Sequence, residues 1–359
     1  MTSIVNAKEF LEAITKATKV NKGRQTLPIL EEVKIDFING KCIITTTNLE
    51  QWGIFSISAN GDNFTIVPQN TSSIVKACKY FKGDLTFEYN EEKNIVKLSS
   101  NNKSCKIACC DSTDYPEIPE VTATNTYHYN ANTLFDRYEK IKYAISQDDL
   151  RPINTGVYFN KNQMATIDGY RLAINSNDEL NIESEFVVPQ GAMNLLNIFE
   201  KTDIEIDVCK KYVAFKDQNT TIISRLLEGD FFDYNGAIPK NNSDEYIVEV
   251  KQYINELKYL KDFTSSRDRN PIKFDNGNLC LYNSNGIFTA KVDIKGKANA
   301  VYGFNINYMM DGLSQFKDNK NVVIKSGTSV DPIILTDNKD NLALVLPVKL
   351  KYSDEVEIA

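Results

Sequence analysis

The sequence predicts an α+β fold built from three repeated domains. Stripes of apolar residues at helical spacing alternate with strand-like runs, and this order starts again twice, each time after about 120 residues. The length of 359 residues also exceeds what one ordinary core takes and favours two or three domains. A repeat this long can hold its own core, so we expect duplicated domains over 1–121, 122–243 and 244–359.

The first copy opens with a helix signal. Asn6 suits an N-cap and Glu9 stands three residues later, which is the pattern of a capping box. The apolar residues that follow share one helix face, which we expect to be core: Phe10, Leu11, Ile14 and Ala17. Three strands are predicted over 33–38, 41–48 and 53–58. Val67-Pro68 opens a second predicted helix, and three more strands end at the proline-rich, acidic stretch 114–120, a domain boundary.

The second and third copies repeat this order. The second copy matches the first in four places: Arg151–Val157 for Arg24–Leu30, the Asp-Gly turn within Ala165–Ala173 for Thr45–Gln51, Val188-Pro189 for Val67-Pro68, and Phe231–Pro239 for Asp114–Pro119. The third copy is fainter, with helices near 250–260 and 306–316, a turn at Asn285-Gly286 and closing strands over 342–350. Each copy should hold a helix, about three strands, a second helix and about three further strands.

The composition favours a binding protein over an enzyme. No apolar run approaches the roughly 18 residues of a membrane span, so we expect a cytoplasmic protein without membrane contact. Seven cysteines form no CxxC pair and are odd in number, which favours reduced thiols over disulfides or zinc ligands. The single histidine, His128, and the lack of nucleophile-elbow, phosphate-loop or zinc-protease motifs leave little catalytic chemistry. We expect no catalytic residue, no metal and no cofactor, and we interpret Asp337–Asn341 as a hairpin turn rather than a calcium loop.

Lysine is concentrated on the predicted helices although the net charge is −7. Solvated helix faces explain each helix taken singly. The recurrence of the bias across the repeat favours a second explanation, a basic surface that attracts DNA on an otherwise acidic body. The helix residues that we assign to it are Lys8, Lys76, Lys79, Arg137, Lys140 and Lys258.

Several motifs, taken in their order and spacing, resemble those of the bacterial β sliding clamp, the processivity subunit of DNA polymerase III. The motifs are RQTLPIL (Arg24–Leu30), TTNLE (Thr46–Glu50), DYP (Asp114–Pro116), RPINTGV (Arg151–Val157), ATIDGYRLA (Ala165–Ala173), Val188-Pro189, FDY (Phe232–Tyr234) with Pro239, and VLPVKL (Val345–Leu350). The resemblance covers essentially the whole chain, and the RPxxTGV form is similar to that of low-GC Gram-positive bacteria.

The resemblance implies a function as well as a fold. Such clamps are head-to-tail homodimers that close a ring, with helices lining the hole and strands outside. The ring encircles double-stranded DNA without reading its sequence, because it meets only phosphates. It has no catalytic activity and confers processivity by tethering the replicative polymerase. The clamp-loading complex and repair proteins bind as well, through short Gln-Leu-x-Leu-Phe-like motifs.

The resemblance also assigns residues. Arg24 becomes a DNA contact, with the helix residues above as our additions. The partner-peptide groove comprises Ile167, Gly169, Tyr170, Arg171, Leu172, Pro239, Leu344, Leu346 and Pro347. Its leucines and isoleucine offer apolar pockets and Arg171 a charged rim; core strand residues are the other interpretation of Leu172 and Leu346. The dimer interface comprises Cys105, Ile107 and Phe263.

Some residues depart from the family pattern, and two other functions stay open. Asn154 stands where the family places an apolar groove residue, and Asp148 and Asp149 put acid near the expected DNA side. The nine residues 351–359 extend past the usual end; they are either a frayed terminus or a tail whose Val356 and Ile358 visit the groove while its acids pair with Arg171. The rival functions are a β-rich hydrolase that uses Asp168 and Asp233, and a peptide-binding scaffold that forms no ring.

Overall fold

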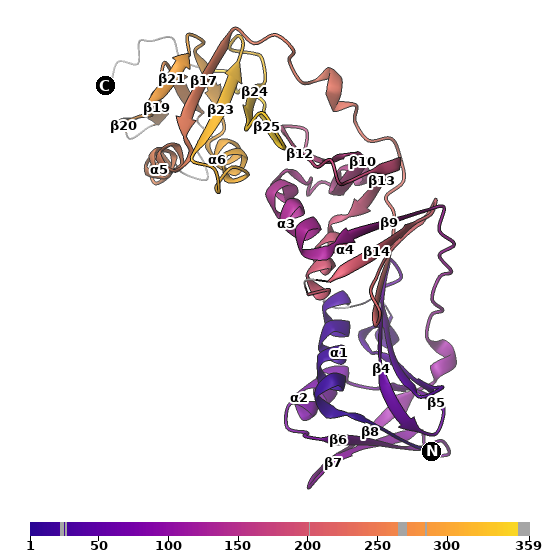
Figure 1. Cartoon of the computed structure of the whole chain (residues 1–359). Coiled ribbons are helices and arrows are strands. Elements are labelled where there is room, and N and C mark those ends of the chain that lie inside the picture. The colour runs from indigo at the N-terminus through magenta and orange to yellow at the C-terminus, as the bar shows by residue number, and fades with distance from the viewer. Residues whose placement is uncertain (22–24, 26, 201, 265–270, 284–285, 351–359) are drawn as a thin grey trace. The chain divides into compact units, whose positions relative to one another are not determined.

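The computed structural model describes residues 1–21, 25, 27–200, 202–264, 271–283 and 286–350 (Figure 1). The chain forms two compact units. Unit 1 contains Met1–Phe135 and Gly191–Leu226, and unit 2 contains Asp136–Gln190 and Leu227–Ala359. This division by contacts groups residues of neighbouring repeats, and the three-domain boundaries stay a prediction.

The helices and strands follow the predicted order three times. The first copy holds β1 (Thr2–Asn6), α1 (Ala7–Val20), β2 (Lys34–Ile38), β3 (Lys41–Thr47), β4 (Gln51–Gly61), β5 (Phe64–Pro68), α2 (Thr71–Cys78), β6 (Asp84–Asn90), β7 (Ile95–Ser100) and β8 (Lys103–Cys110). The second holds β9 (Asn125–Asn130), α3 (Ala131–Ile141), β10 (Gly156–Lys161), β11 (Gln163–Ile167), β12 (Arg171–Ser176), β13 (Ile182–Pro189), α4 (Gln190–Leu195), β14 (Asp203–Val208), β15 (Tyr212–Lys216) and β16 (Thr220–Arg225).

The third copy keeps this order with one added strand, β21. It holds β17 (Asp244–Glu249), α5 (Val250–Lys261), β18 (Ile272–Asp275), β19 (Asn278–Asn283), β20 (Gly286–Lys291), β21 (Ile294–Lys297), β22 (Tyr302–Phe304), α6 (Ile306–Ser314), β23 (Asn321–Ser326), β24 (Ile333–Thr336) and β25 (Asn341–Val345). Val67-Pro68, predicted to open the second helix, ends β5 instead, and α2 begins at Thr71. The expectation of about three strands per half misses the strand before each second helix and the short strand that precedes each first helix. Such strands, β1 and β17 among them, alternate for only a few residues before the helical period begins, so their pattern is weak.

The first helix shows why these residues form this element. The Asn6 side chain accepts hydrogen bonds from the backbone N–H groups of Lys8 (3.0 Å) and Glu9 (3.2 Å), as predicted for an N-cap. Phe10 and Ile14 are fully buried on the face that meets the strands. Helix α1 packs beside α2 in unit 1, and α5 packs beside α6 in unit 2 (Figure 1).

Neighbouring copies share sheets. In unit 1 the strand order is β1-β6-β7-β8-β5-β2-β3-β4-β16-β15-β14-β9, so β4 of the first copy pairs with β16 of the second. In unit 2 the order is β13-β10-β11-β12-β25-β24-β23-β17-β21, so β12 of the second copy pairs with β25 of the third. The strands β20-β19-β18-β22 form a separate sheet. At both junctions, therefore, the third strand after the first helix of one copy (β4 or β12) pairs with the last strand of the next copy (β16 or β25).

The turns at the two junctions confirm the repeat at the level of single hydrogen bonds. Asn48 Oδ1 accepts from the N–H groups two and three residues later, at 3.1 and 2.7 Å, and Asp168 Oδ1 does the same at 3.0 and 3.0 Å. The last strand of the next copy closes each junction, with Arg225 N–H donating to Glu50 O and Leu346 N–H to Tyr170 O, both at 2.9 Å. Position two of the turn has positive φ in both, +72° at Leu49 and +87° at Gly169.

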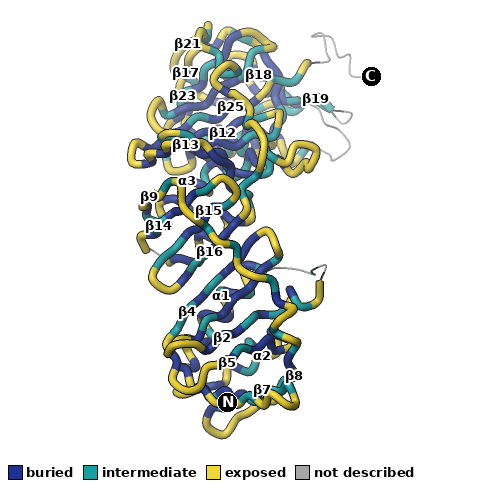
Figure 2. Tube along the Cα trace, turned by 90° about the vertical axis from the view of Figure 1, so that its right-hand side faces the viewer, coloured by how far each residue is buried: buried dark blue, intermediate teal, exposed yellow. Residues whose placement is uncertain are grey.

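Buried residues run along the strands of both units, and exposed residues gather at the turns between strands (Figure 2). The third copy has a core with six fully buried aromatic side chains: Tyr246, Tyr253, Phe274, Tyr302, Phe304 and Phe316. A smaller cluster under the β12–β25 junction joins Tyr158, Leu172, Tyr234 and Leu344. None of the helices in the described part of the chain is long and apolar enough to cross a membrane.

Candidate functional site

The structure brings most of the predicted groove residues together at the β12–β25 junction of unit 2. Leu172 pairs with Leu344 across the two strands, and Ile167 packs against the same apolar cluster. Leu172 and Leu344 are only 2% and 4% exposed, so they form the floor of this region. Leu346 is 37% exposed and Tyr170 is 60% exposed, and these two present apolar surface to solvent. Pro239 and Pro347 are half-buried.

Gly169 makes the tight turn between β11 and β12 possible. Its φ of +87° lies in the left-handed region, which glycine reaches without steric cost. A Cβ added here would meet nothing within 4 Å, so the constraint on this position is conformational rather than one of space. The turn sets Tyr170 outward and directs Arg171 toward the third copy.

Arg171 is held by charged and aromatic partners on both sides. Its Nε donates to Asp168 Oδ2 at 2.7 Å, and its Nη1 donates to Asp311 Oδ2 on α6. The guanidinium carbon lies 4.5 Å from the ring centroid of Tyr308 and 5.6 Å from that of Tyr143. Burial lowers the pKa of Arg171, but the two carboxylates outweigh it and leave the pKa above its ordinary value. Arg171 is therefore a permanent cation with little exposed surface.

Hydrogen bonds tie the groove to the third copy beside this ion pair. Gln315 is 2% exposed and donates from Nε2 to Ile174 O at 2.8 Å, while its Oε1 accepts from Tyr143 Oη at 3.0 Å. Burial raises the pKa of Tyr143, so it stays a neutral donor. The side chains of Asn175 and Asn341 also bond, at 2.8 Å. Together with the shared sheet, these contacts make the floor and polar end of the groove one packed structure.

Three residues of this site were missed by sequence reasoning. Asp311 and Tyr308 lie on α6 and Tyr143 follows α3, with 140 residues separating Arg171 from Asp311. An acid on an exposed helix face carries no signal that it faces a distant arginine. The fold alone reveals the pairing, because it places α6 against β25, the neighbour of β12.

The predicted basic residues differ in how available they are. Lys8, Lys76 and Lys258 are exposed on their helices, and Lys79 is exposed just past the end of α2. Lys8 lies 3.9 Å from Glu12 one turn later. Lys140 is half-buried. Arg137 is held in the protein, because its Nη1 donates to Asn175 Oδ1 at 2.9 Å and to Ser176 O at 3.0 Å. Arg24 and the tail 351–359 lie outside the described residues.

The predicted interface residues lie on β8, which is only partly paired on one side, and beside β20. Strand β7 pairs with β8 along one side. On the other side β5 meets β8 at Cys109 and Cys110, and Gln69 N–H donates to Ala108 O at 2.9 Å. Cys105 and Ile107 are half-buried on this strand. Strand β20 is the outer strand of its sheet, and Phe263 stacks on its Phe288 with ring centroids 4.0 Å apart.

The two carboxylates of the hydrolase alternative have structural partners instead of facing one another. Asp168 holds Arg171 and its own turn. Asp233 caps a short turn by accepting from the N–H of Asn235 at 3.1 Å. Asn154, the predicted departure, donates its N–H to Arg151 O at 3.0 Å, and Asp148 and Asp149 are exposed.

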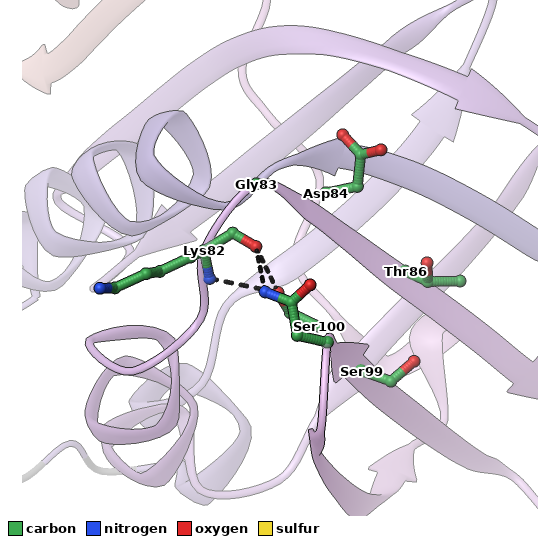
Figure 3. Close-up of a pocket in the computed structure, with 7 residues that line it drawn as sticks. Lys82, Gly83, Asp84, Thr86, Ser99 and Ser100 are labelled. Atoms are coloured by element: carbon green, nitrogen blue, oxygen red, sulfur yellow. Dashed lines mark hydrogen bonds between the residues drawn. The ribbon is translucent and has the colours of Figure 1, made fainter.

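A polar pocket of about 470 Å³ lies in unit 1 between the start of β6 and the end of β7 (Figure 3). Its lining comprises Lys82, Gly83, Asp84, Thr86, Ser99, Ser100 and Asn101. The Ser100 hydroxyl donates to Lys82 O at 2.7 Å and accepts from Lys82 N–H at 3.1 Å, so the buried polar group is satisfied. The Lys82 side chain extends away from these residues in Figure 3. The pocket thus offers neither an apolar wall nor an unpaired buried group to a ligand.

Comparison with known proteins identifies relatives along the whole chain. The family model of the DNA polymerase III beta subunit, N-terminal domain, matches residues 1–119, and that of the central domain matches residues 129–233, together more than half of the chain. The beta sliding clamp of Staphylococcus epidermidis is 26% identical over 368 positions, which cover 95% of this chain and 97% of that protein.

Solved structures agree on the fold. A putative DNA polymerase III beta subunit from Eubacterium rectale superposes with a TM-score of 0.90 at 20% identity, over 97% of this chain and 99% of that chain. The sliding clamp from Bartonella birtlesii, solved with griselimycin bound, gives a TM-score of 0.88 at 21% identity, over 98% of this chain and 100% of that one.

Proposed function

Because the chain belongs to the family of the DNA polymerase III beta subunit, the bacterial β sliding clamps, we propose that it closes a homodimeric ring around duplex DNA and tethers partner proteins through the groove at the β12–β25 junction. The family is non-catalytic. The function proposed here is therefore topological: the ring holds a polymerase near its template because it cannot leave the DNA without opening.

The strand order of the repeat carries the ring proposal. At both junctions the third strand after the first helix of one copy pairs with the last strand of the next copy, β4 with β16 and β12 with β25. The corresponding strand of the third copy, β20, has a free edge within the described residues, and so has the last strand of the first copy, β8, over Ser104–Ile107. Two chains that join β20 to β8 twice continue the same pairing rule around a closed ring.

The repeat also predicts the register of this seam. Trp52 faces Ile223 and Leu172 faces Leu344 at the two internal junctions. Ile287 holds the equivalent place in β20, because it follows the pair Asn283 and Gly286 as Leu172 follows the hydrogen-bonded pair Asp168 and Arg171. On β8 the equivalent place is Ile107.

The assignment of Ile107 follows from the neighbouring strand. Leu227 N–H donates to Val187 O, one residue before Val188-Pro189, while Cys110 faces Val67 of Val67-Pro68. In this register Asp111 comes opposite the residue before Val67, just as Leu227 comes opposite Val187, the residue before Val188. Asp111 therefore corresponds to Leu227, and Ile107, four residues earlier, corresponds to Ile223. Ile287, which is 42% exposed, would be covered by the partner's copy of an apolar edge residue.

The groove and the exposed lysines support the two other parts of the proposal. Exposed Leu346 and Tyr170 lie above a rigid apolar floor, which suits a short extended peptide with apolar anchors such as Gln-Leu-x-Leu-Phe. Exposed Lys76, Lys79 and Lys258 on or just past helices suit loose phosphate contact, which permits sliding. Cytoplasmic location is part of the same proposal.

A cysteine pair tests the seam register. In a Cys105→Ser background, Ile107→Cys combined with Ile287→Cys should give a covalent dimer on mild oxidation, because opposed residues in antiparallel strands lie about 4.5–5.5 Å apart at Cα. Each single variant, and Ile287→Cys combined with Ile38→Cys on the exposed end of β2, serve as controls and should stay uncrosslinked. Monomeric protein from the 107/287 pair after oxidation would refute the seam.

A further inference from the structure

The polar end of the groove carries an acidic and aromatic corner, formed by Asp311, Tyr170 and Tyr308. The Asp311 side chain is 45% exposed, and Tyr170 is 60% exposed. The rings of Tyr170 and Tyr308 stack with centroids 5.9 Å apart and planes 26° apart. Tyr170 O accepts the N–H of Leu346, so the corner directly adjoins the exposed apolar surface of the groove.

Arg171 does not make this corner basic. One guanidinium is shared by two carboxylates, which leaves an excess of one negative charge. The Asp168 side chain is 13% exposed and that of Asp311 is 45% exposed, so the excess charge faces solvent at Asp311. The Tyr308 ring lies 4.5 Å from the guanidinium carbon and covers one of its faces. An acidic ligand would have to displace an existing carboxylate to reach Arg171.

We propose that the Asp311, Tyr170 and Tyr308 corner is a subsite for a cationic side chain, so that the partner segments bound by this groove carry a lysine or arginine beside their apolar anchors. This inference rests on the proposed peptide groove. Asp311 Oδ2 is occupied by Arg171, and within the described residues Oδ1 accepts no hydrogen bond, which leaves it for a ligand. The exposed ring of Tyr170 offers the same cation an electron-rich face.

Charge selection of this kind depends on the internal pairing of Arg171. Sequence reasoning treats Arg171 as a rim that pairs with acids, and by that reasoning the preferred partner residue is Asp or Glu. The structure reverses the sign, because the arginine is neutralised internally and the exposed carboxylate belongs to α6. A lysine in the partner gains an ion pair, whereas an aspartate at the same place meets a like charge.

The test uses the full-length protein and a set of labelled peptides. Each peptide contains Gln-Leu-Ser-Leu-Phe with two serines added at both ends, and one serine is replaced in turn by lysine or by aspartate. At the position that reaches the corner, we expect the lysine peptide to bind about fivefold more tightly than the aspartate peptide, a difference that shrinks at high salt.

Three variants locate the effect. Asp311→Asn should reduce the preference to less than about twofold. Tyr170→Leu should weaken the lysine peptide more than the aspartate peptide. Asp318→Asn removes the same charge from an exposed position beyond the end of α6 and should leave the preference intact. Thermal melts check that all three variants fold.

The outcomes separate the two claims. Equal binding of lysine and aspartate peptides at every position, or a preference that survives Asp311→Asn, overturns the cationic subsite while the groove stands. If no peptide of the set binds, the groove itself is refuted and the subsite with it.

Discussion

At the residue scale, burial separates two leucines that lie two positions apart in the sequence. Leu344 is 4% exposed and belongs to the apolar cluster beneath the groove, whereas Leu346 is 37% exposed. Both were predicted as groove residues from the family resemblance, as apolar residues near Pro347. Alternation along a strand indicates which residues share a face, but it does not tell whether that face is covered by another strand or by solvent.

This difference predicts that alanine substitution at the two leucines affects different properties, stability at Leu344 and peptide binding at Leu346. Leu344→Ala should lower the free energy of unfolding by about 2–4 kcal/mol, because it leaves a cavity in a packed cluster. Leu346→Ala should lower it by less than about 1 kcal/mol and instead weaken peptide binding at least about fivefold. Denaturant titration and fluorescence anisotropy measure the two quantities; a large loss of stability in Leu346→Ala would mean that this residue is core.

Arg171 marks the limit of local reasoning at this scale. Its turn with Asp168 spans four residues and could be predicted from Asp-Gly chemistry. Its second carboxylate, Asp311, comes from a helix far along the chain, and the stacked Tyr308 comes from the same helix. Hydrogen bonds within a short turn can be predicted from the sequence, whereas ion pairs between distant residues depend on how the copies pack against each other.

At the scale of elements, the repeated turn shows how much of the fold is predictable. The motifs Thr46–Glu50 and Ala165–Ala173 differ in nearly every residue, yet the acid or amide at the turn start accepts the same two hydrogen bonds. Leu49 adopts the positive φ that Gly169 adopts elsewhere, a conformation that costs a leucine roughly 1–2 kcal/mol. A sequence match therefore finds the turn, but a match by glycine alone would have missed the first copy.

The turn between β24 and β25 yields a prediction about pH. Burial raises the pKa of Asp337, but hydrogen bonds from Asn341 and Lys339 outweigh it and hold the pKa below the ordinary value. A depressed folded-state pKa stabilises the protein above the unfolded value of about 4, and this stability is lost as pH falls through the folded value. Asp337→Ala should therefore cost about 1–2 kcal/mol at neutral pH and less near pH 3. Equal costs at both pH values in urea titrations would contradict the assignment.

The free edge of β8 yields a prediction about assembly. Ile107→Asp places a carboxylate in an apolar seam, at a cost of several kcal/mol if unpaired, so the variant should sediment as a monomer. Ile38→Asp makes the same change at a side chain that is 46% exposed at the end of β2 and should stay dimeric. An Ile107→Asp dimer of unchanged affinity would place the interface elsewhere.

The exposed lysines on and just past α2 and on α5 yield a prediction about DNA. Lys76→Ala, Lys79→Ala and Lys258→Ala together should weaken DNA association and make it less sensitive to salt, since each phosphate contact contributes to the salt dependence. The matched control is Lys41→Ala, Lys93→Ala and Lys210→Ala together, at three exposed lysines outside the helices. Wild-type loading and salt dependence in the triple variant would show that this helix surface does not face DNA.

At the scale of the whole molecule, the repeat was predictable and the closure was not. Motifs recurring after about 120 residues predicted three copies, because each copy must satisfy the same hairpins and core faces. Which strands would share a sheet could not be predicted, since pairing between copies leaves no local pattern in β4, β16, β12 or β25. The pairing rule seen at the two junctions within the chain is the basis for the third junction, which we propose between β20 of one chain and β8 of another.

One measurement tests the central claim, that the chain encircles DNA as a closed ring. The protein is loaded onto nicked circular DNA by its clamp-loading complex, and the bound fraction is followed by gel filtration before and after a restriction enzyme linearises the circle. A ring held only by topology stays on the circle through the column and runs off the linear form. Loss from both forms alike, or retention on both alike, would contradict the account.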